Sequence, residues 1–117
     1  MENMKSKVLE KIKGNLSPEE IKKAMIFWQP EKLSAGQMIQ LGNFSSKMPF
    51  NGTVAFIDLE PTANWGHACK YFLIDENIEK IQKIDAQFPP FADNNTNFLL
   101  LSRYGVIPSD EKNFNPF

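Results

Sequence analysis

The side chains that could carry chemistry gather in the middle of the chain. His67 and Cys69 are the only histidine and the only cysteine among the 117 residues. Two carboxylates, Asp58 and Glu60, stand shortly before them. Imidazole, thiolate and carboxylate groups are ligands that Zn²⁺ accepts, and a thiol with a nearby imidazole is a familiar nucleophile and base. These four residues therefore define a candidate site for a small metal-dependent or thiol enzyme.

The flanking residues place the four side chains on one face of a predicted hairpin. Apolar and polar residues alternate on both sides of the short connection 61–66, which predicts two strands. If those strands pair antiparallel, Asp58 lies opposite Cys69 and Glu60 lies opposite His67. All four side chains then share one face, because side chains alternate along a strand.

The same residues also fit a structural role. Same-face neighbours on a strand stand about 6–7 Å apart, which is too far for direct proton transfer between Cys69 and His67. The spacing also matches no established metal signature. An ion pair of His67 with a carboxylate, covered by Trp65, would close the loop, and Cys69 would be a small buried apolar side chain. This interpretation is favoured, so no metal and no cofactor are expected.

Aromatic residues beside prolines define candidate contacts with a partner. The motif "FPPF" at 88–91 presents two phenylalanines on an extended backbone, and the tail "NFNPF" ends the sequence. Exposed aromatic side chains are typical of protein-binding surfaces. The candidate binding residues are Trp65, Phe88, Phe91, Phe114 and Phe117. A ligand pocket under the phenylalanine-rich loop is a third, weaker alternative.

Length and composition limit the class of protein. A chain of 117 residues with 42% hydrophobic residues predicts a single globular domain. Thirteen basic against 14 acidic residues leave no basic surplus for binding nucleic acid. No apolar run approaches the roughly 18 residues of a membrane span, and no signal-like apolar segment is seen. We therefore expect a cytoplasmic protein that binds neither nucleic acid nor membrane.

Residues 1–30 are predicted to form two short helices. The first covers 3–13, and Gly14 and Asn15 should end it in the left-handed conformation. A Ser-x-x-Glu capping box at Ser17 starts the second helix, which should run until Pro30 stops it. The expected apolar face of this second helix consists of Ile21, Ala24, Met25 and Trp28.

Residues 36–107 are predicted to be mainly β, and 108–117 form a tail. Asn51-Gly52 favours a type I′ hairpin turn, and residues 75–77 favour another turn. The run 78–88 fits a helix or a strand, and the strand is favoured. The expected fold class is α+β: two N-terminal helices packed on one face of a mostly antiparallel sheet of four or five strands.

The expected function is that of a small non-catalytic cytoplasmic binding or accessory module. It would act through contacts with another protein or through self-association. The alternative is the enzyme, metal-dependent or thiol-based, at Asp58, Glu60, His67 and Cys69.

Overall fold

The computed structural model describes residues 2–60, 68–90 and 98–107. Two helices come first, α1 (Glu2–Lys13) and α2 (Pro18–Lys23). Seven strands follow: β1 (Met25–Leu33), β2 (Met38–Leu41), β3 (Phe44–Lys47), β4 (Gly52–Asp58), β5 (Cys69–Asp75), β6 (Ile81–Ala86) and β7 (Leu99–Arg103).

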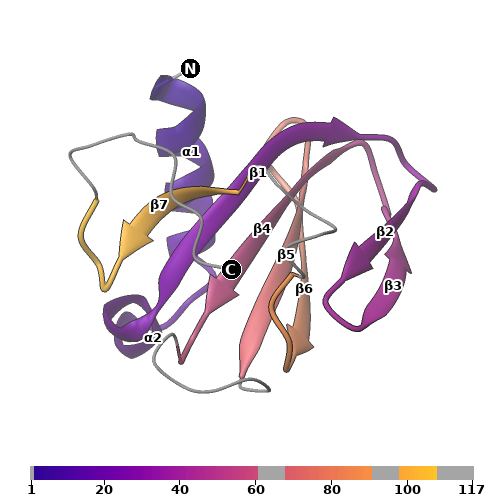
Figure 1. Ribbon diagram of the computed structural model, residues 1–117. Coiled ribbons are helices and arrows are strands. Elements are labelled where there is room, and N and C mark those ends of the chain that lie inside the picture. Colours follow the sequence, from indigo (N-terminus) through magenta and orange to yellow (C-terminus); the bar gives the residue numbers. More distant parts are fainter. Residues whose placement is uncertain (1, 61–67, 91–97, 108–117) are drawn as a thin grey trace.

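Five of these strands form one antiparallel sheet in the order β6-β5-β4-β1-β7, and β2 and β3 form a separate hairpin (Figure 1). The helix α1 lies behind the sheet in this view, and the β2–β3 hairpin projects at the right. The predicted α+β class and the mostly antiparallel sheet are confirmed. The run 78–88 contains β6, so its assignment as a strand is also confirmed.

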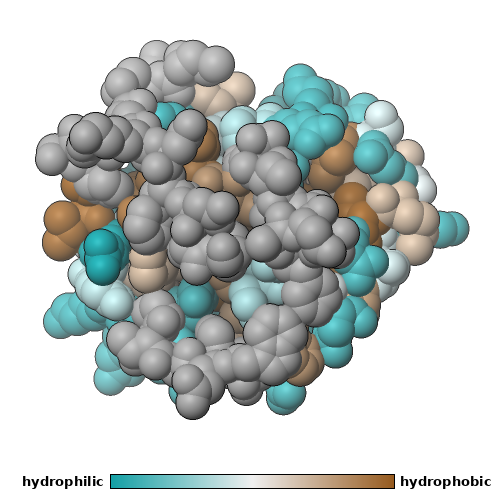
Figure 2. Space-filling view, in the orientation of Figure 1, coloured by the Kyte–Doolittle hydropathy of each residue, from teal (hydrophilic) through white to brown (hydrophobic). Residues whose placement is uncertain are grey.

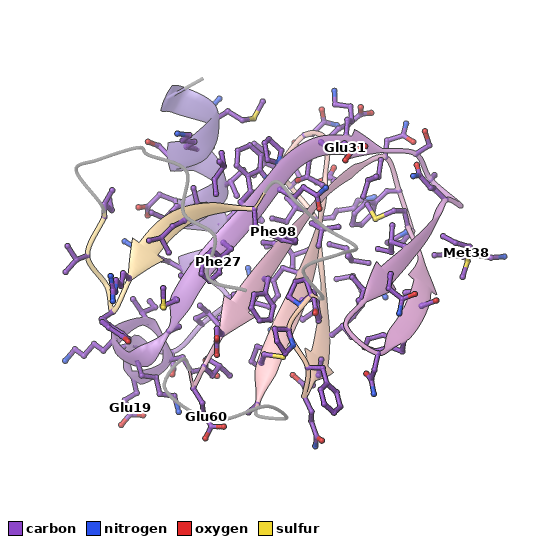
Figure 3. All side chains as sticks on the ribbon, viewed as in Figure 1. Glu19, Phe27, Glu31, Met38, Glu60 and Phe98 are labelled. Atoms are coloured by element: carbon purple, nitrogen blue, oxygen red, sulfur yellow. The ribbon has the colours of Figure 1, made fainter. Side chains whose placement is uncertain are left out.

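Both faces of the five-stranded sheet carry a hydrophobic core, because alternate residues of the central strands point to opposite sides. The core on the α1 side contains Val8, Leu9, Ile12, Leu16, Ala24, Ile26, Trp28, Ala55, Ile57, Phe72, Ile74 and Leu101. The core on the other side contains Met25, Phe27, Leu33, Leu41, Met48, Val54, Phe56, Cys69, Tyr71, Leu73 and Phe98. Phe27 and Phe98 are labelled on this second side (Figure 3).

The prediction of two packed N-terminal helices is wrong. Only α1 contributes buried side chains, whereas the six residues of α2 contribute none. The expected second helix ends at Lys23, and the apolar residues after it begin β1, an interior strand. Met25 to Trp28 are all buried, and they alternate between the two cores, which requires a strand. Pro30 lies where the pairing of β1 with β4 shifts register, the kind of position in which a sheet tolerates proline.

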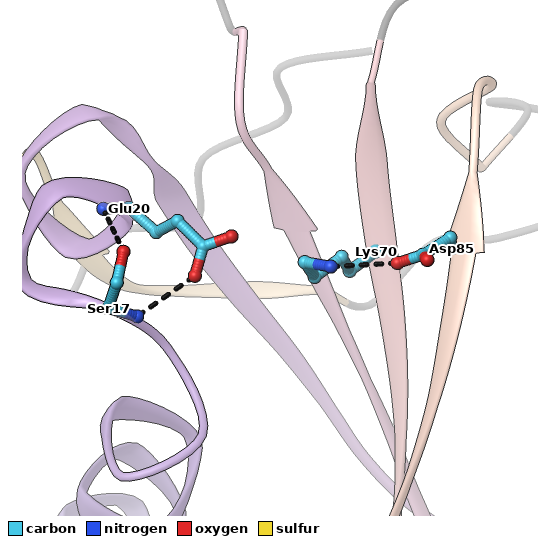
Figure 4. Close-up of polar contacts among 4 residues, drawn as sticks. All are labelled: Ser17, Glu20, Lys70 and Asp85. Atoms are coloured by element: carbon cyan, nitrogen blue, oxygen red, sulfur yellow. Dashed lines mark hydrogen bonds and ion pairs between the residues drawn. The ribbon is translucent and has the colours of Figure 1, made fainter.

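The start of the second helix and the end of the first at Lys13 were predicted correctly, but the left-handed conformation expected after Lys13 was not. Ser17 Oγ accepts a hydrogen bond from Glu20 N at 3.1 Å, and Glu20 Oε1 accepts one from Ser17 N at 2.9 Å (Figure 4). This is the expected capping box. Neither Gly14 nor Asn15 has a positive φ. Instead, Asn15 Nδ2 donates to Lys11 O at 2.9 Å and so satisfies a carbonyl of the last turn.

The Asn51-Gly52 hairpin turn was also predicted incorrectly. Neither residue has the positive φ that a type I′ turn requires. β3 and β4, which flank the pair, lie in different sheets. Asn51 instead joins two loops, because its side-chain oxygen accepts from Ala35 N and its carbonyl accepts from Glu76 N, both at 2.8 Å.

Asp75 closes the turn between β5 and β6. Its Oδ1 accepts hydrogen bonds from Glu79 N at 2.6 Å and from Lys80 N at 2.7 Å. Ile78 in this turn adopts a φ of 58°, which is costly for a β-branched residue. Burial raises the pKa of Asp75, but the backbone donors of Lys80, Glu79 and Asn77 outweigh it, and the net pKa lies below the ordinary value. The ionised carboxylate therefore holds the turn together.

We expect Asp75→Asn to lower the free energy of unfolding at neutral pH by about 2 kcal/mol, since it weakens bonds to a charged acceptor. A folded pKa below the unfolded value gives stability that is present above the unfolded pKa. That stability is lost as the pH falls through the folded pKa. Urea titrations from neutral to strongly acidic pH should therefore show the wild type approaching the variant on acidification. Glu79→Gln removes an exposed charge of the same turn and is the control. A difference that stays constant down to acidic pH would contradict this role.

Candidate functional site

The structure brings Asp58 and Cys69 together as the sequence predicts. They are direct cross-strand partners at the end of the β4–β5 ladder, and Phe56 faces Tyr71 two residues further along. The register inferred from the alternating residues is therefore confirmed. Of the other two site candidates, Glu60 is described and His67 lies outside the described residues.

Cys69 is placed as a core residue. Only 2% of it is exposed, and its Sγ donates to the carbonyl of Phe88 at 3.5 Å. Burial, followed by the negative charge of Asp58, raises the pKa of Cys69 to about 12. The thiol is therefore protonated at neutral pH, and the thiolate that a nucleophile requires is scarce.

Tyr71 shares the hydrogen-bond acceptor of Cys69. Its hydroxyl donates to the carbonyl of Phe88 at 2.8 Å, and burial, with a smaller effect of Cys69, raises its pKa. The backbone also approaches closely here, because a Cβ on Gly42 would lie 2.7 Å from the same carbonyl oxygen. This cluster ties the end of β6 and the β2–β3 hairpin to β5, which is a structural role.

The two carboxylates make local backbone contacts. Asp58, 9% exposed, accepts a hydrogen bond from Glu60 N at 3.1 Å. Glu60 lies beyond the end of β4 (Figure 3) and accepts one from Ala68 N at 3.1 Å. Glu60 thus spans the two ends of the connection 61–67. Within residues 2–60, 68–90 and 98–107, no three His, Cys, Asp or Glu side chains are grouped so that they could hold a metal ion.

Of the aromatic binding candidates, the structure describes Phe88 alone. Its carbonyl is the acceptor for Cys69 and Tyr71, and the residue is half-buried. The other four, Trp65, Phe91, Phe114 and Phe117, lie outside the described residues.

An exposed apolar turn follows β7, and the sequence analysis missed it. We name residues 104–107 the β7 turn. Tyr104 is 42% exposed, Val106 65% and Ile107 61%. Figure 2 shows hydrophobic surface at the left edge of the molecule, where Figure 1 places the segment after β7. The available signal was the sequence "YGVI", a glycine next to two β-branched residues, but such a run also fits the end of a buried strand.

Backbone hydrogen bonds fix the conformation of the β7 turn. Arg103 N donates to Val106 O at 2.8 Å, and Val106 N donates to Arg103 O at 3.0 Å. Tyr104 N donates to Ala24 O at 2.9 Å, which ties the turn to the start of β1. Tyr104 and Gly105 have φ values of 55° and 86°. The guanidinium of Arg103 lies 5.7 Å from the centre of the Tyr104 ring. The apolar side chains are thus presented on a defined backbone.

A shallow cavity of about 490 Å³ lies between α1 and the turn after β5. It is lined by Ser6, Lys7, Glu10, Lys11, Asn77 and Ile78. These side chains are exposed or half-buried, and they mix both signs of charge. This lining does not indicate one class of ligand.

Comparison with known proteins finds no relative. No protein-family model matches the chain, and neither the curated proteins nor the solved structures contain a match. None of the helices in the described part of the chain is long and apolar enough to cross a membrane.

Proposed function

We propose that this protein is a small non-catalytic cytoplasmic binding module that acts through contact with another protein. The observation that carries the proposal is the β7 turn, where Tyr104, Val106 and Ile107 are exposed together. Apolar side chains are solvated unfavourably by water. Their burial against a partner is favourable by about 25 cal/mol per Å² of apolar surface. An apolar cluster on a monomer surface is typical of an interaction site.

The fixed backbone of the turn supports this proposal further. Binding costs free energy when loops must become ordered, and a preformed turn avoids that cost. Three backbone hydrogen bonds hold the turn, one of them to Ala24 at the edge of the α1-side core. Tyr104 keeps a left-handed φ of 55°, and residues held in such conformations are often found at functional sites.

The protonation state of Cys69 argues against the thiol-enzyme alternative. Catalysis by this residue needs a thiolate, whereas a pKa of about 12 leaves the buried thiol protonated. The metal-dependent alternative depends on His67, which is outside the described residues. The aromatic residues Trp65, Phe91, Phe114 and Phe117 stay part of the binding proposal as further contacts.

Site-specific photocrosslinking tests the proposal. A photoreactive amino acid is placed at Val106, and in a control protein at Met38, an exposed apolar residue of the β2–β3 hairpin that is 57% exposed (Figure 3). We expect position 106 to give a discrete adduct in a lysate that position 38 does not give. Excess unlabelled wild type should suppress the adduct, whereas excess Ile107→Asp protein should not. Equal suppression by both competitors, or no adduct from position 106, would contradict the proposal.

A further inference from the structure

Among the described residues, the strand β6 is an edge strand of the main sheet. It is the last strand of the order β6-β5-β4-β1-β7, and within the described ranges only β5 pairs with it. The opposite edge differs, because the chain folds back on the end of β7 through the bridge between Arg103 and Val106. Open strand edges are templates for pairing with another strand. The edge strand β6 consists of six residues, Ile81–Ala86.

The pairing of β6 with β5 fixes which backbone groups point outward. Asp75 N donates to Lys80 O at 3.1 Å, so these opposite residues form a hydrogen-bonded pair. Hydrogen-bonded and non-hydrogen-bonded pairs alternate along an antiparallel ladder. Gln82 and Ile84 therefore direct their backbone groups toward β5, whereas Lys83 and Asp85 direct theirs outward.

The charges of β6 favour one symmetric register. A register centred on Gln82 places no charged residues of β6 opposite each other. In a two-fold antiparallel pair of identical strands, a register centred on Lys83 places two lysines opposite each other. A register centred on Asp85 does the same with two aspartates. The register centred on Ile84 instead places Lys83 of each copy opposite Asp85 of the other, twice. Opposite charges across an antiparallel pair stabilise it, and like charges destabilise it.

We infer that two copies of this protein associate through the outer edges of β6, with Lys83 of each copy opposite Asp85 of the other. The outward backbone groups of these two residues then form the central hydrogen bonds of the new ladder. The half-buried Ile84 meets its own copy on the two-fold axis.

The neighbouring strand supports the same register. Lys70 Nζ lies 2.7 Å from Asp85 Oδ1 within one chain (Figure 4). In the pair, Asp85 lies between this lysine and Lys83 of the second copy, so the signs alternate across three strands. Lys70, through a hydrogen bond and its charge, lowers the pKa of Asp85, which therefore stays ionised.

This association goes beyond the proposed function and does not depend on it. The two five-stranded sheets would join into one continuous sheet, with β7 at each far edge. Each pair would then present two β7 turns, and a partner with two binding sites would gain from their effective concentration.

Sedimentation velocity over a wide range of protein concentration tests the inference. Wild type should show a concentration-dependent equilibrium of monomer and dimer. Lys83→Glu places two acids opposite each other, and Asp85→Lys places two lysines opposite each other. Each variant alone should dimerise about tenfold more weakly or worse, because both cross-strand pairs become repulsive. Circular dichroism and thermal midpoints of the variants check that both are folded.

The equimolar mixture of the two variants is the decisive arm. In a mixed pair, the substituted glutamate faces the substituted lysine, and the native Lys83 of one chain faces the native Asp85 of the other. The mixture should therefore regain dimer that neither variant forms alone. A wild type that is monomeric at every concentration would overturn the inference, as would a mixture no more associated than its components. Crosslinking from Val106 is scored separately, so a failure here is distinguishable from a failure of the proposed function.

Discussion

Phe56→Ala is expected to lower the free energy of unfolding by about 4 kcal/mol, in the range of phenylalanine truncations in protein cores. Phe56 is 0% exposed and belongs to the central strand β4. Its ring lies 6.0 Å from the ring of Phe27 and 5.2 Å from that of Tyr71, centre to centre. Truncation removes the contacts with both rings and leaves a cavity between three strands, which the sheet backbone cannot close.

Urea denaturation measures this loss, and Phe56→Leu is the matched control. Leucine keeps most of the apolar volume, so its cost should stay near 1 kcal/mol. The dependence of unfolding free energy on urea should be unchanged in both variants, since the exposed surface on unfolding hardly differs. A loss of less than about 1 kcal/mol for Phe56→Ala would mean that this side of the sheet is not a packed core.

Gly52→Ala is expected to cost about 3 kcal/mol, the upper range for inserting atoms into a well-packed core. Gly52 pairs with Leu33 of β1 on one side and with Asp75 of β5 on the other. A Cβ at this position would lie 1.9 Å from the carbonyl oxygen of Ile74. Backbone cannot move away as a flexible side chain can, so β4 and β5 would have to separate.

Gly14→Ala is the control for the loss of a glycine as such. A Cβ there meets its nearest atom, Glu10 O, at 3.5 Å, an ordinary contact. Its φ is not in the left-handed region, so alanine should be neutral or stabilising by up to about 1 kcal/mol. The thermal unfolding midpoints of both variants test this expectation. Equal midpoints for the two would contradict the close approach of β4 and β5 at Gly52.

The pairing of β4 with β5 could be predicted from the sequence because two constraints agreed. The apolar residues alternate, and the connection between the strands is short, which leaves little freedom in register. Asp58 therefore faces Cys69, and Phe56 faces Tyr71, as expected. The burial of Cys69 was also expected, and only 2% of it is exposed. Its hydrogen bond to the carbonyl of Phe88 could not be predicted, because that residue is distant in sequence.

The start of β1 was wrongly predicted as helix, because its apolar residues fit both the helical and the strand periodicity. Met25 and Trp28 have helical spacing, but Ile26 and Phe27 between them are just as buried. A continuous apolar run is typical of a strand with both faces covered, and periodicity alone cannot separate it from a buried helix. That both faces of β1 are buried follows only from the order of the strands, which places β1 between β4 and β7. Pro30 was then read as the end of a helix, whereas it marks an irregularity in a strand.

The β7 turn could not be recognised from residue types. Val106 and Ile107 would suit a buried strand equally well, and their exposure results from the tight reversal after Arg103. That reversal needs positive φ at Tyr104 and Gly105, and tyrosine rarely adopts it. The hydrogen bond to Ala24, distant in sequence, holds it in place.

The affinity of the protein captured from position 106 for purified variants tests the central claim most directly. Val106→Asp removes the most exposed apolar side chain of the β7 turn, and Met38→Asp makes the same kind of change on the β2–β3 hairpin. Calorimetric titration should show binding weakened about tenfold or more by Val106→Asp, as for the loss of a central interface residue. Met38→Asp should bind like wild type. Equal affinity of wild type and Val106→Asp would contradict the assignment of the β7 turn as the binding surface.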